Sequence, residues 1–185
     1  MPEDLRAHLV ATGVELVTAE GTDALSLREI ARRAGVSHGA PRRYFPTHRE
    51  LLAAVARVGY DRLSDRIAAL GEQRDPRAGL LALGRLYLDF ARTDRGMFEL
   101  MFRHELLRGN QEGLRAASKP LFAVLVEFVA RARPGRDDAA VAAGALWANL
   151  HGIAQLWSWG SLQMTVETED ADALLRTAID AYVES

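Results

Sequence analysis

Six arginines gather between residues 28 and 49, around the segment GVSHGAPRRYF at residues 35–45. Glu29 is the one acidic residue between positions 28 and 49, so the stretch carries a local excess of five positive charges. Guanidinium groups bind phosphate and guanine through paired hydrogen bonds, which points to nucleic-acid recognition. A solvated arginine face is the alternative interpretation of such a cluster. The arginines are Arg28, Arg32, Arg33, Arg42, Arg43 and Arg49.

The segment around Pro41 predicts a short helix that begins after Ser37 and ends at Pro46. Ser37 is expected to cap this helix, so that Pro41 comes fourth and forfeits one backbone hydrogen bond at reduced cost. Pro46 ends it because the residue before a proline is pushed out of the α region. Gly39 lets the helix end approach another surface closely, and the exposed amides of a helix N-terminus suit a phosphate.

Other chemistries have no comparable pattern in the chain. The five histidines include no metal-binding pair at positions i and i+4, and we find no phosphate loop, nucleophile elbow or paired-carboxylate motif. The absence of cysteine excludes disulfides, thiol redox sensing and thiolate metal sites. We therefore expect no enzyme, no metal and no cofactor.

Length and composition fit one compact protein or two small units. Apolar residues make up 49% of the 185 residues, and the net charge of −2 does not by itself indicate a nucleic-acid binder. No apolar run approaches the length needed to span a membrane, and the opening MPEDLRAHL lacks the order of a signal peptide. We expect a soluble, cytoplasmic protein without a membrane partner.

Helical periodicity dominates, and no two-residue alternation appears. Two capping boxes mark helix starts, Ser26 with Glu29 and Thr47 with Glu50. Pro120 either starts a helix or kinks one. We expect an all-α protein of about nine helices, at about residues 4–19, 26–34, 38–45, 47–70, 76–92, 95–102, 111–132, 137–162 and 170–183.

The order of these helices predicts two functional parts. Two helices joined by a tight turn at Gly35, the second bearing arginines, form the layout of a helix-turn-helix, whose second helix enters the major groove of DNA. We expect a three-helix DNA-binding unit over residues 1–46, a linking helix over 47–70 and a larger helical bundle over 71–185.

At this point a family resemblance becomes visible. The stretch SLREIARRAGVSHGAPRRYFPTHRELLAAV, residues 26–55, closely resembles the DNA-binding signature of tetracycline-repressor-type (TetR) transcriptional regulators. LWANLHGIAQLW, residues 146–157, resembles the Trp-His-Gly (WHG) motif of one subgroup's C-terminal domain. The resemblance implies a homodimeric repressor that binds a palindromic operator and is released by a small apolar or aromatic molecule.

Three positions depart from the family pattern. Arg42 stands where the family usually has a phosphate-binding Tyr, and His48 stands near the position of a frequent Lys. The phosphate contact of His48 should therefore be weaker or pH-dependent. Tyr44 replaces a residue that is more often His.

The predicted DNA contacts fall into two groups, because phosphate contacts position a protein and base contacts specify the sequence. Ser26, Arg28, Arg42 and Tyr44 are assigned mainly to phosphate, and His38, Ala40 and Arg43 to base edges. Phe45 is expected in the core, and Arg32 and Arg33 are as well explained by a solvated role. The predicted DNA-binding set is Ser26, Arg28, Ser37, His38, Gly39, Ala40, Arg42, Arg43, Tyr44 and His48.

The C-terminal bundle is predicted to hold an effector site and a dimer interface. Core packing is the simpler role for any one large side chain, but together they describe a small-molecule pocket. The predicted ligand-binding residues are Tyr87, Phe90, Met97, Phe98, Met101, Phe102, Phe122, Trp147 and His151. The predicted dimer residues lie on two helices that the resemblance implies will pair with their copies, and they are Ala143, Trp157, Leu174, Leu175, Ala178, Ile179 and Tyr182.

Two other functions remain open from the sequence. A ligand-independent DNA-binding or architectural protein would have the same helix-turn-helix without an effector site. An activator would bind DNA in the same way as a repressor but would increase transcription.

Overall fold

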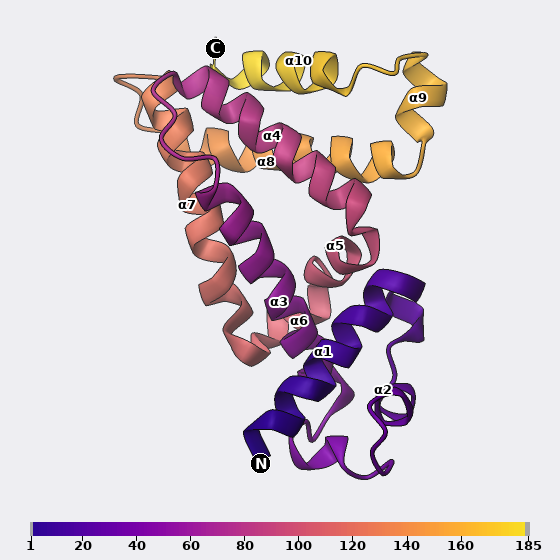
Figure 1. Cartoon of the computed structure of the whole chain (residues 1–185). Coiled ribbons are helices and arrows are strands. Elements are labelled where there is room, and N and C mark those ends of the chain that lie inside the picture. Colours follow the sequence, from indigo (N-terminus) through magenta and orange to yellow (C-terminus); the bar gives the residue numbers. More distant parts are fainter. Residues whose placement is uncertain (1, 184–185) are drawn as a thin grey trace. The chain divides into compact units, whose positions relative to one another are not determined.

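The structure is a computed structural model that describes residues 2–183, and all regular elements within these residues are helical (Figure 1). The chain divides into two compact units. Unit 1 comprises Met1–Arg62 and Asp94–Ser118, and unit 2 comprises Leu63–Thr93 and Lys119–Ser185. The division into a DNA-binding part and a bundle at residue 46 concerns function and stays a prediction.

Unit 1 is built from two separate stretches of the sequence. It holds α1 (Pro2–Glu20), η1 (Thr22–Ala24), α2 (Leu27–Arg33), η2 (Pro41–Arg43), most of α3 (His48–Ala68), α5 (Arg95–Met101), α6 (His104–Gly109), η3 (Gln111–Gly113) and the first turn of α7 (Leu114–Ala132). Unit 2 holds the end of α3, α4 (Pro76–Thr93), the rest of α7, α8 (Ala139–Ser158), α9 (Ser161–Val166) and α10 (Ala171–Val183).

Both predicted helix starts carry a side-chain cap. Thr47 and Glu50 form the full capping box, in which Thr47 Oγ1 accepts from the Glu50 amide at 3.2 Å and Glu50 Oε2 accepts from the Thr47 amide at 2.9 Å. Ser26 Oγ accepts from the Glu29 amide at 3.1 Å, but the Glu29 carboxylate holds Arg32 and Arg33 instead of reaching back. The box at Ser26 is therefore only half formed.

The helix predicted over residues 38–45 is wrong in type and in its start. The regular element is the 3-10 turn η2, which begins at Pro41 with Ala40 as its N-cap residue, not Ser37. Tyr44 and Phe45 both donate their amides to the Pro41 carbonyl, at 3.0 and 2.8 Å. Because proline has no amide hydrogen, the first position of a helical turn is where it costs least.

Three further boundaries differ from the predicted pattern. The segment 111–132 contains η3 and then α7, and Pro120 lies inside α7 rather than at its start. The segment 137–162 breaks at Gly160, whose φ of 77° lies in the left-handed region that favours glycine. The short helices α6 and α9 were not predicted, because six residues are too few to show helical periodicity.

Close helix contacts in unit 1 depend on glycine. A Cβ atom on Gly13 of α1 would lie 2.6 Å from Val55, and one on Gly59 of α3 would lie 2.5 Å from the Met101 sulfur. The helices α1 and α5 also pack together in this unit. The buried core extends to the segment that follows α2, where Phe45 is fully buried.

In unit 2, α4, α8 and α10 pack against one another (Figure 1). Leu175 of α10 covers Gly84 of α4, beside Leu150 of α8. Two ion pairs join α4 to α10, Arg85 with Asp172 and Arg77 with Asp180. The arginines and the aspartates are each eight residues apart in opposite chain order, as an antiparallel helix pair requires. No helix among residues 2–183 has the length and apolar character needed to cross a membrane.

Candidate nucleic-acid interface and ligand site

The turn between α2 and η2 has the predicted geometry. Gly35 has a φ of 67°, and the Val36 amide donates to the Ala31 carbonyl at 3.0 Å, which closes the end of α2. The Ala40 amide then donates to the Ser37 carbonyl at 2.9 Å. A compact turn therefore leads from α2 directly into the segment that bears Arg42 and Arg43.

Most of the predicted DNA-binding side chains are exposed on this segment. Arg42 and Arg43 are exposed, while their neighbour Pro41 is buried and anchors the turn to unit 1. Ala40 and Tyr44 are half-buried. The other exposed members of the predicted set are Ser26, Arg28, Ser37, His38, Gly39 and His48.

Gly39 has open space around it. A Cβ atom built on Gly39 would meet nothing within 4 Å, and its backbone is not in the left-handed region. The fold of the chain itself therefore does not require glycine here. This is compatible with the prediction that the missing side chain leaves room for another molecule.

Arg32 and Arg33 have a different environment from Arg42 and Arg43. Glu29 bonds to Arg32 Nη2 at 2.6 Å and to Arg33 Nε at 2.7 Å, and Arg33 also pairs with Glu20. The side-chain hydrogen bonds from Arg32, followed by those from Arg33, lower the pKa of Glu29 to about 2. This network supports the solvated, structural role for Arg32 and Arg33.

His48 has a partner that the sequence did not suggest. Its Nε2 donates to the Leu25 carbonyl at 2.7 Å, because a carbonyl oxygen can only accept. The ring thereby ties the first residue of α3 to the residue before the N-cap of α2. A phosphate contact by His48, if made in this conformation, has to come from Nδ1.

Unit 2 contains an aromatic cluster, which we define as Tyr87, Phe122, Trp147 and His151. The Tyr87 hydroxyl lies 2.8 Å from His151 Nδ1 and accepts from Trp147 Nε1 at 3.3 Å. Phe122 packs edge-on against Trp147 with ring centroids 6.3 Å apart. Burial lowers the pKa of His151, which favours the neutral ring. The structure thus brings together four predicted ligand-binding residues from α4, α7 and α8.

The remaining predicted ligand residues lie in other surroundings. Met97, Phe98 and Met101 are buried in unit 1, where Met97 and Met101 pack over Gly59. Phe102 lies beside Phe98, with ring centroids 5.0 Å apart. These residues fill the core of unit 1, which is the simpler role that the sequence left open for them.

Two further contacts involve Phe90 in unit 2 and Met101 in unit 1. Phe90 is buried in unit 2 with the Arg66 guanidinium 5.2 Å from the centre of its ring. The Tyr60 hydroxyl donates to the Met101 carbonyl at 2.8 Å, and burial raises the pKa of Tyr60.

The predicted dimer residues are only partly available to a second copy. Ala143, Leu175 and Ile179 are buried within one protomer, because α8 and α10 already use that side to cover each other and α4. These three side chains pack inside the protomer, and the interface itself stays a prediction. Trp157, Leu174, Ala178 and Tyr182 are half-buried, and the Tyr182 hydroxyl accepts from Asn149 Nδ2 at 2.6 Å.

A different face of α8 is open. At 100° per residue, Val141, Ala148 and Leu156 of α8 fall on one side of the helix axis, together with Trp159, the residue that follows α8. All four are exposed, Val141 to 77% and Trp159 to 51%. Gly144 and Gly152 lie on the same side, and a Cβ atom on either of them would meet nothing within 4 Å.

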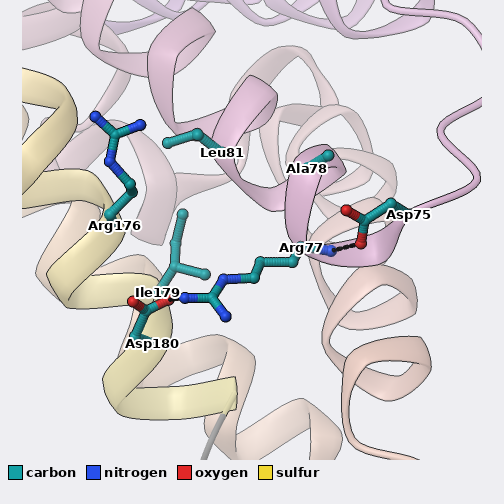
Figure 2. Close-up of a pocket in the computed structure, with 7 residues that line it drawn as sticks. All are labelled: Asp75, Arg77, Ala78, Leu81, Arg176, Ile179 and Asp180. Carbon is teal, nitrogen blue, oxygen red and sulfur yellow. Dashed lines mark hydrogen bonds and ion pairs between the residues drawn. The ribbon is translucent and has the colours of Figure 1, made fainter.

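A shallow groove between α4 and α10 is internally paired (Figure 2). Arg77 reaches across it toward Asp180, and Ala78, Leu81 and Ile179 line it together with Asp75 and Arg176. Arg176 lies 3.8 Å from Asp172. Since aspartates already neutralise both arginines, the groove serves the contact between the two helices.

Asp94 is a residue that sequence reasoning missed. It is buried before α5, where Oδ1 accepts from Thr18 Oγ1 at 3.2 Å and Oδ2 accepts from Arg62 at 3.3 Å. Gly96 lies two residues later, and a Cβ there would lie 2.3 Å from the Val17 carbonyl oxygen. These contacts fix α5 to α1 and α3 within unit 1.

Comparisons with known proteins agree with this geometry. Residues 9–55 match the family described as bacterial regulatory proteins, tetR family, and residues 80–182 match the tetracyclin repressor-like C-terminal domain. The HTH-type transcriptional regulator PksA of Bacillus subtilis (strain 168) is 35% identical over 65 residues. These residues are 35% of this chain and 32% of PksA, so the match spans about a third of that protein.

Two solved structures are similar along nearly the whole chain. A protein with unknown function from Rhodococcus sp. RHA1 is 30% identical with a TM-score of 0.73, over 97% of this chain and 94% of that one. RolR in complex with resorcinol is 22% identical with a TM-score of 0.70, over 98% and 88%, and shares the fold. Because the C-terminal match alone covers more than half of the sequence, the chain belongs to the TetR family of bacterial transcriptional regulators.

Proposed function

We propose that this chain is a ligand-responsive repressor that binds a palindromic operator as a dimer and leaves it when a small apolar or aromatic molecule binds. Members of its family are transcriptional regulators and not enzymes. The observation that carries the proposal is the exposed, cationic segment after α2. Arg42 and Arg43 are exposed there and Arg28 is exposed at the start of α2, while Glu29 is paired with Arg32 and Arg33.

The exposed residues divide into positioning and reading roles. Arg28 and Ser26 lie at the start of α2, where guanidinium, hydroxyl and amide groups suit a phosphate. Arg43 can pair with the O6 and N7 atoms of guanine, and Ala40 can touch a thymine methyl group. Arg42 replaces the usual tyrosine and supplies a phosphate contact that is stronger and more dependent on salt.

The open face of α8 supports the dimer. A soluble protomer would leave Val141, Leu156 and Trp159 in water, and contiguous apolar surface of this kind marks interfaces. Gly144 and Gly152 allow a second helix to approach closely. We propose that this face, with the half-buried side of α10 at Leu174 and Ala178, pairs with its copy as a four-helix interface.

The aromatic cluster of unit 2 supports an effector site. It combines three aromatic rings and a histidine with a few internal hydrogen bonds, the usual make-up of a small-molecule pocket. RolR, which has the same fold, was solved with resorcinol, and this favours an aromatic effector here as well. Assignment to the subgroup with the WHG motif remains a prediction.

Coupling between effector and DNA is proposed to run through α3. This helix begins beside the DNA-binding segment in unit 1 and ends in unit 2 without a break. An effector that binds one conformation more tightly shifts the protein toward it, and equal affinity for both shifts nothing. The shift would change the distance between the two recognition segments of a dimer, which must be about 34–36 Å to reach successive major grooves.

Genome-wide footprinting tests the proposal. We expect a small number of protected palindromic sites, and higher expression of the adjacent genes when the regulator is deleted. Resorcinol is the first effector to assay for release of the purified protein from such a site. Dispersed protection without palindromes would contradict the proposal and favour an architectural DNA-binding protein.

A further inference from the structure

We propose that the aromatic cluster selects an uncharged planar ring and excludes aromatic carboxylates. The inference rests on the proposed function, because it takes this cluster as the effector site and adds the chemistry of the ligand. It concerns Tyr87, Phe122, Trp147 and His151, all of which lie within unit 2.

The rings of the cluster present partly uncovered surface. Phe122 and Trp147 remain 37% and 40% exposed, whereas most large apolar side chains of the described residues are covered. Trp147 and His151 are tilted by 58°, and Tyr87 and His151 by 50°, with centroids 6.2 Å apart in both pairs. Rings at such angles offer an edge and a face to a further ring, which is the arrangement that aromatic groups prefer.

The polar atoms of the cluster bond to one another without a formal charge. An indole N–H can only donate, so the Tyr87 oxygen accepts from Trp147, and a second hydrogen bond at 2.8 Å joins the Tyr87 hydroxyl to His151 Nδ1. Either tautomer of the neutral imidazole makes this second bond without a formal charge. The lowered pKa of His151 agrees with this uncharged state.

Among the described residues, α4 and α8, which carry three members of the cluster, supply no charged side chain without an ion-pair partner. The segment of α8 from Ala139 to Ser158 contains no Asp, Glu, Lys or Arg. On α4, Arg85 pairs with Asp172 and Asp89 pairs with Arg66 and Arg92.

On α7, the cation nearest in sequence to Phe122 is Lys119, one turn earlier and exposed. A carboxylate that bound among these rings would therefore give up part of its hydration without gaining a cationic partner, which is costly.

A matched pair of ligands tests the proposal. 3-Hydroxybenzamide and 3-hydroxybenzoate have nearly the same shape and differ in charge at neutral pH. Titration of the full-length protein, followed by calorimetry and by tryptophan fluorescence, should show binding of the amide. The carboxylate should bind at least about 100-fold more weakly, as expected for a charge that loses hydration without gaining a cationic partner.

A substitution at the exposed edge of the cluster should reverse this preference. Phe122→Lys adds an ammonium group at a position that already meets water, and we expect the affinity for the carboxylate to rise at least about 10-fold relative to the amide. Phe122→Gln is the control of similar length without charge and should not favour the carboxylate. Lys119→Gln should change neither affinity.

Each other outcome overturns the inference. Equal binding of the two ligands by the wild type, or carboxylate binding that disappears in Lys119→Gln, would show that the site holds an anion. Binding of neither ligand would show that the cluster is not a site for an uncharged ring. Operator binding by the same preparation distinguishes failure of this inference from failure of the proposed function. A protein that binds operator but neither ligand remains a regulator. A protein that binds no operator contradicts the proposed function.

Discussion

At the residue scale, Gly39 is informative because the protein itself does not need it. Nothing lies within 4 Å of the position that a Cβ would take, and alanine at a compatible backbone position reduces the conformational freedom of the unfolded chain relative to glycine. We expect Gly39→Ala to leave the free energy of unfolding unchanged or slightly raised while operator affinity falls. Denaturant unfolding and operator titration on the same variant check this, and unchanged operator affinity would show that DNA does not approach this position.

Arg42 and Arg43 are neighbours with different predicted partners. Arg42→Ala should weaken binding to all sequences alike and lower the slope of log affinity against log salt by about one. Arg43→Ala should instead relax the preference at one base pair, with a loss of roughly 1–3 kcal/mol of discrimination.

Titrations against an operator and its single-base variants, at several salt concentrations, measure both effects. Arg32→Ala is the control, since Arg32 is already paired with Glu29. A change of base preference in Arg42→Ala alone would reverse the two roles.

At the element scale, two helical glycines allow a graded test of packing. Gly59→Ala places a methyl group 2.5–2.8 Å from atoms of Met97 and Met101, and overpacking of this kind typically costs about 1–3 kcal/mol. Gly84→Ala meets Leu175 at 3.3 Å and should cost less. Chemical unfolding of both variants measures the difference. If Met101→Ala did not restore part of the stability lost in Gly59→Ala, another contact would be responsible.

The sequence predicted best those helices that are long or that begin or end at a capping residue. Thr47 and Glu50 mark the start of α3, and Gly35 marks the end of α2, because these residues act on the backbone next to them. The type of η2 was missed because Pro41 can stand either fourth in a helix capped by Ser37 or first in a turn that begins at Pro41 itself. The break at Gly160 was missed because apolar residues continue on both sides of it.

In the candidate site, too, features formed by neighbouring residues were predictable from the sequence, whereas contacts between separate helices were not. The exposed arginine segment was predictable, since it is one continuous stretch. The link between Tyr87 and His151 depends on how α4 meets α8, and the partners of Asp94 come from α1 and α3. Likewise, composition identified α8 and α10 as apolar, but only packing shows that Leu175 and Ile179 face the protomer's own core.

At the scale of the whole molecule, the open face of α8 predicts a dimer that one charge should disrupt. Leu156 is 39% exposed, so Leu156→Glu should leave the protomer folded while light scattering shows a monomer at micromolar concentration. Leu175→Glu should instead unfold the protomer, because that side chain is 1% exposed. If the Leu156→Glu variant formed a dimer as tightly as the wild type does, the interface would lie elsewhere.

Ligand and operator are predicted to oppose each other through the whole molecule without sharing a site. If the ligand prefers the conformation that cannot bind DNA, linkage requires operator DNA to weaken ligand binding by the same factor by which ligand weakens operator binding. Calorimetric titration of the free dimer and of its operator complex measures this factor directly. Phe122→Trp enlarges a partly exposed ring of the cluster and should abolish the response to ligand, while operator affinity stays near that of the wild type. Identical ligand affinity with and without operator would exclude this mechanism even for a ligand that binds tightly.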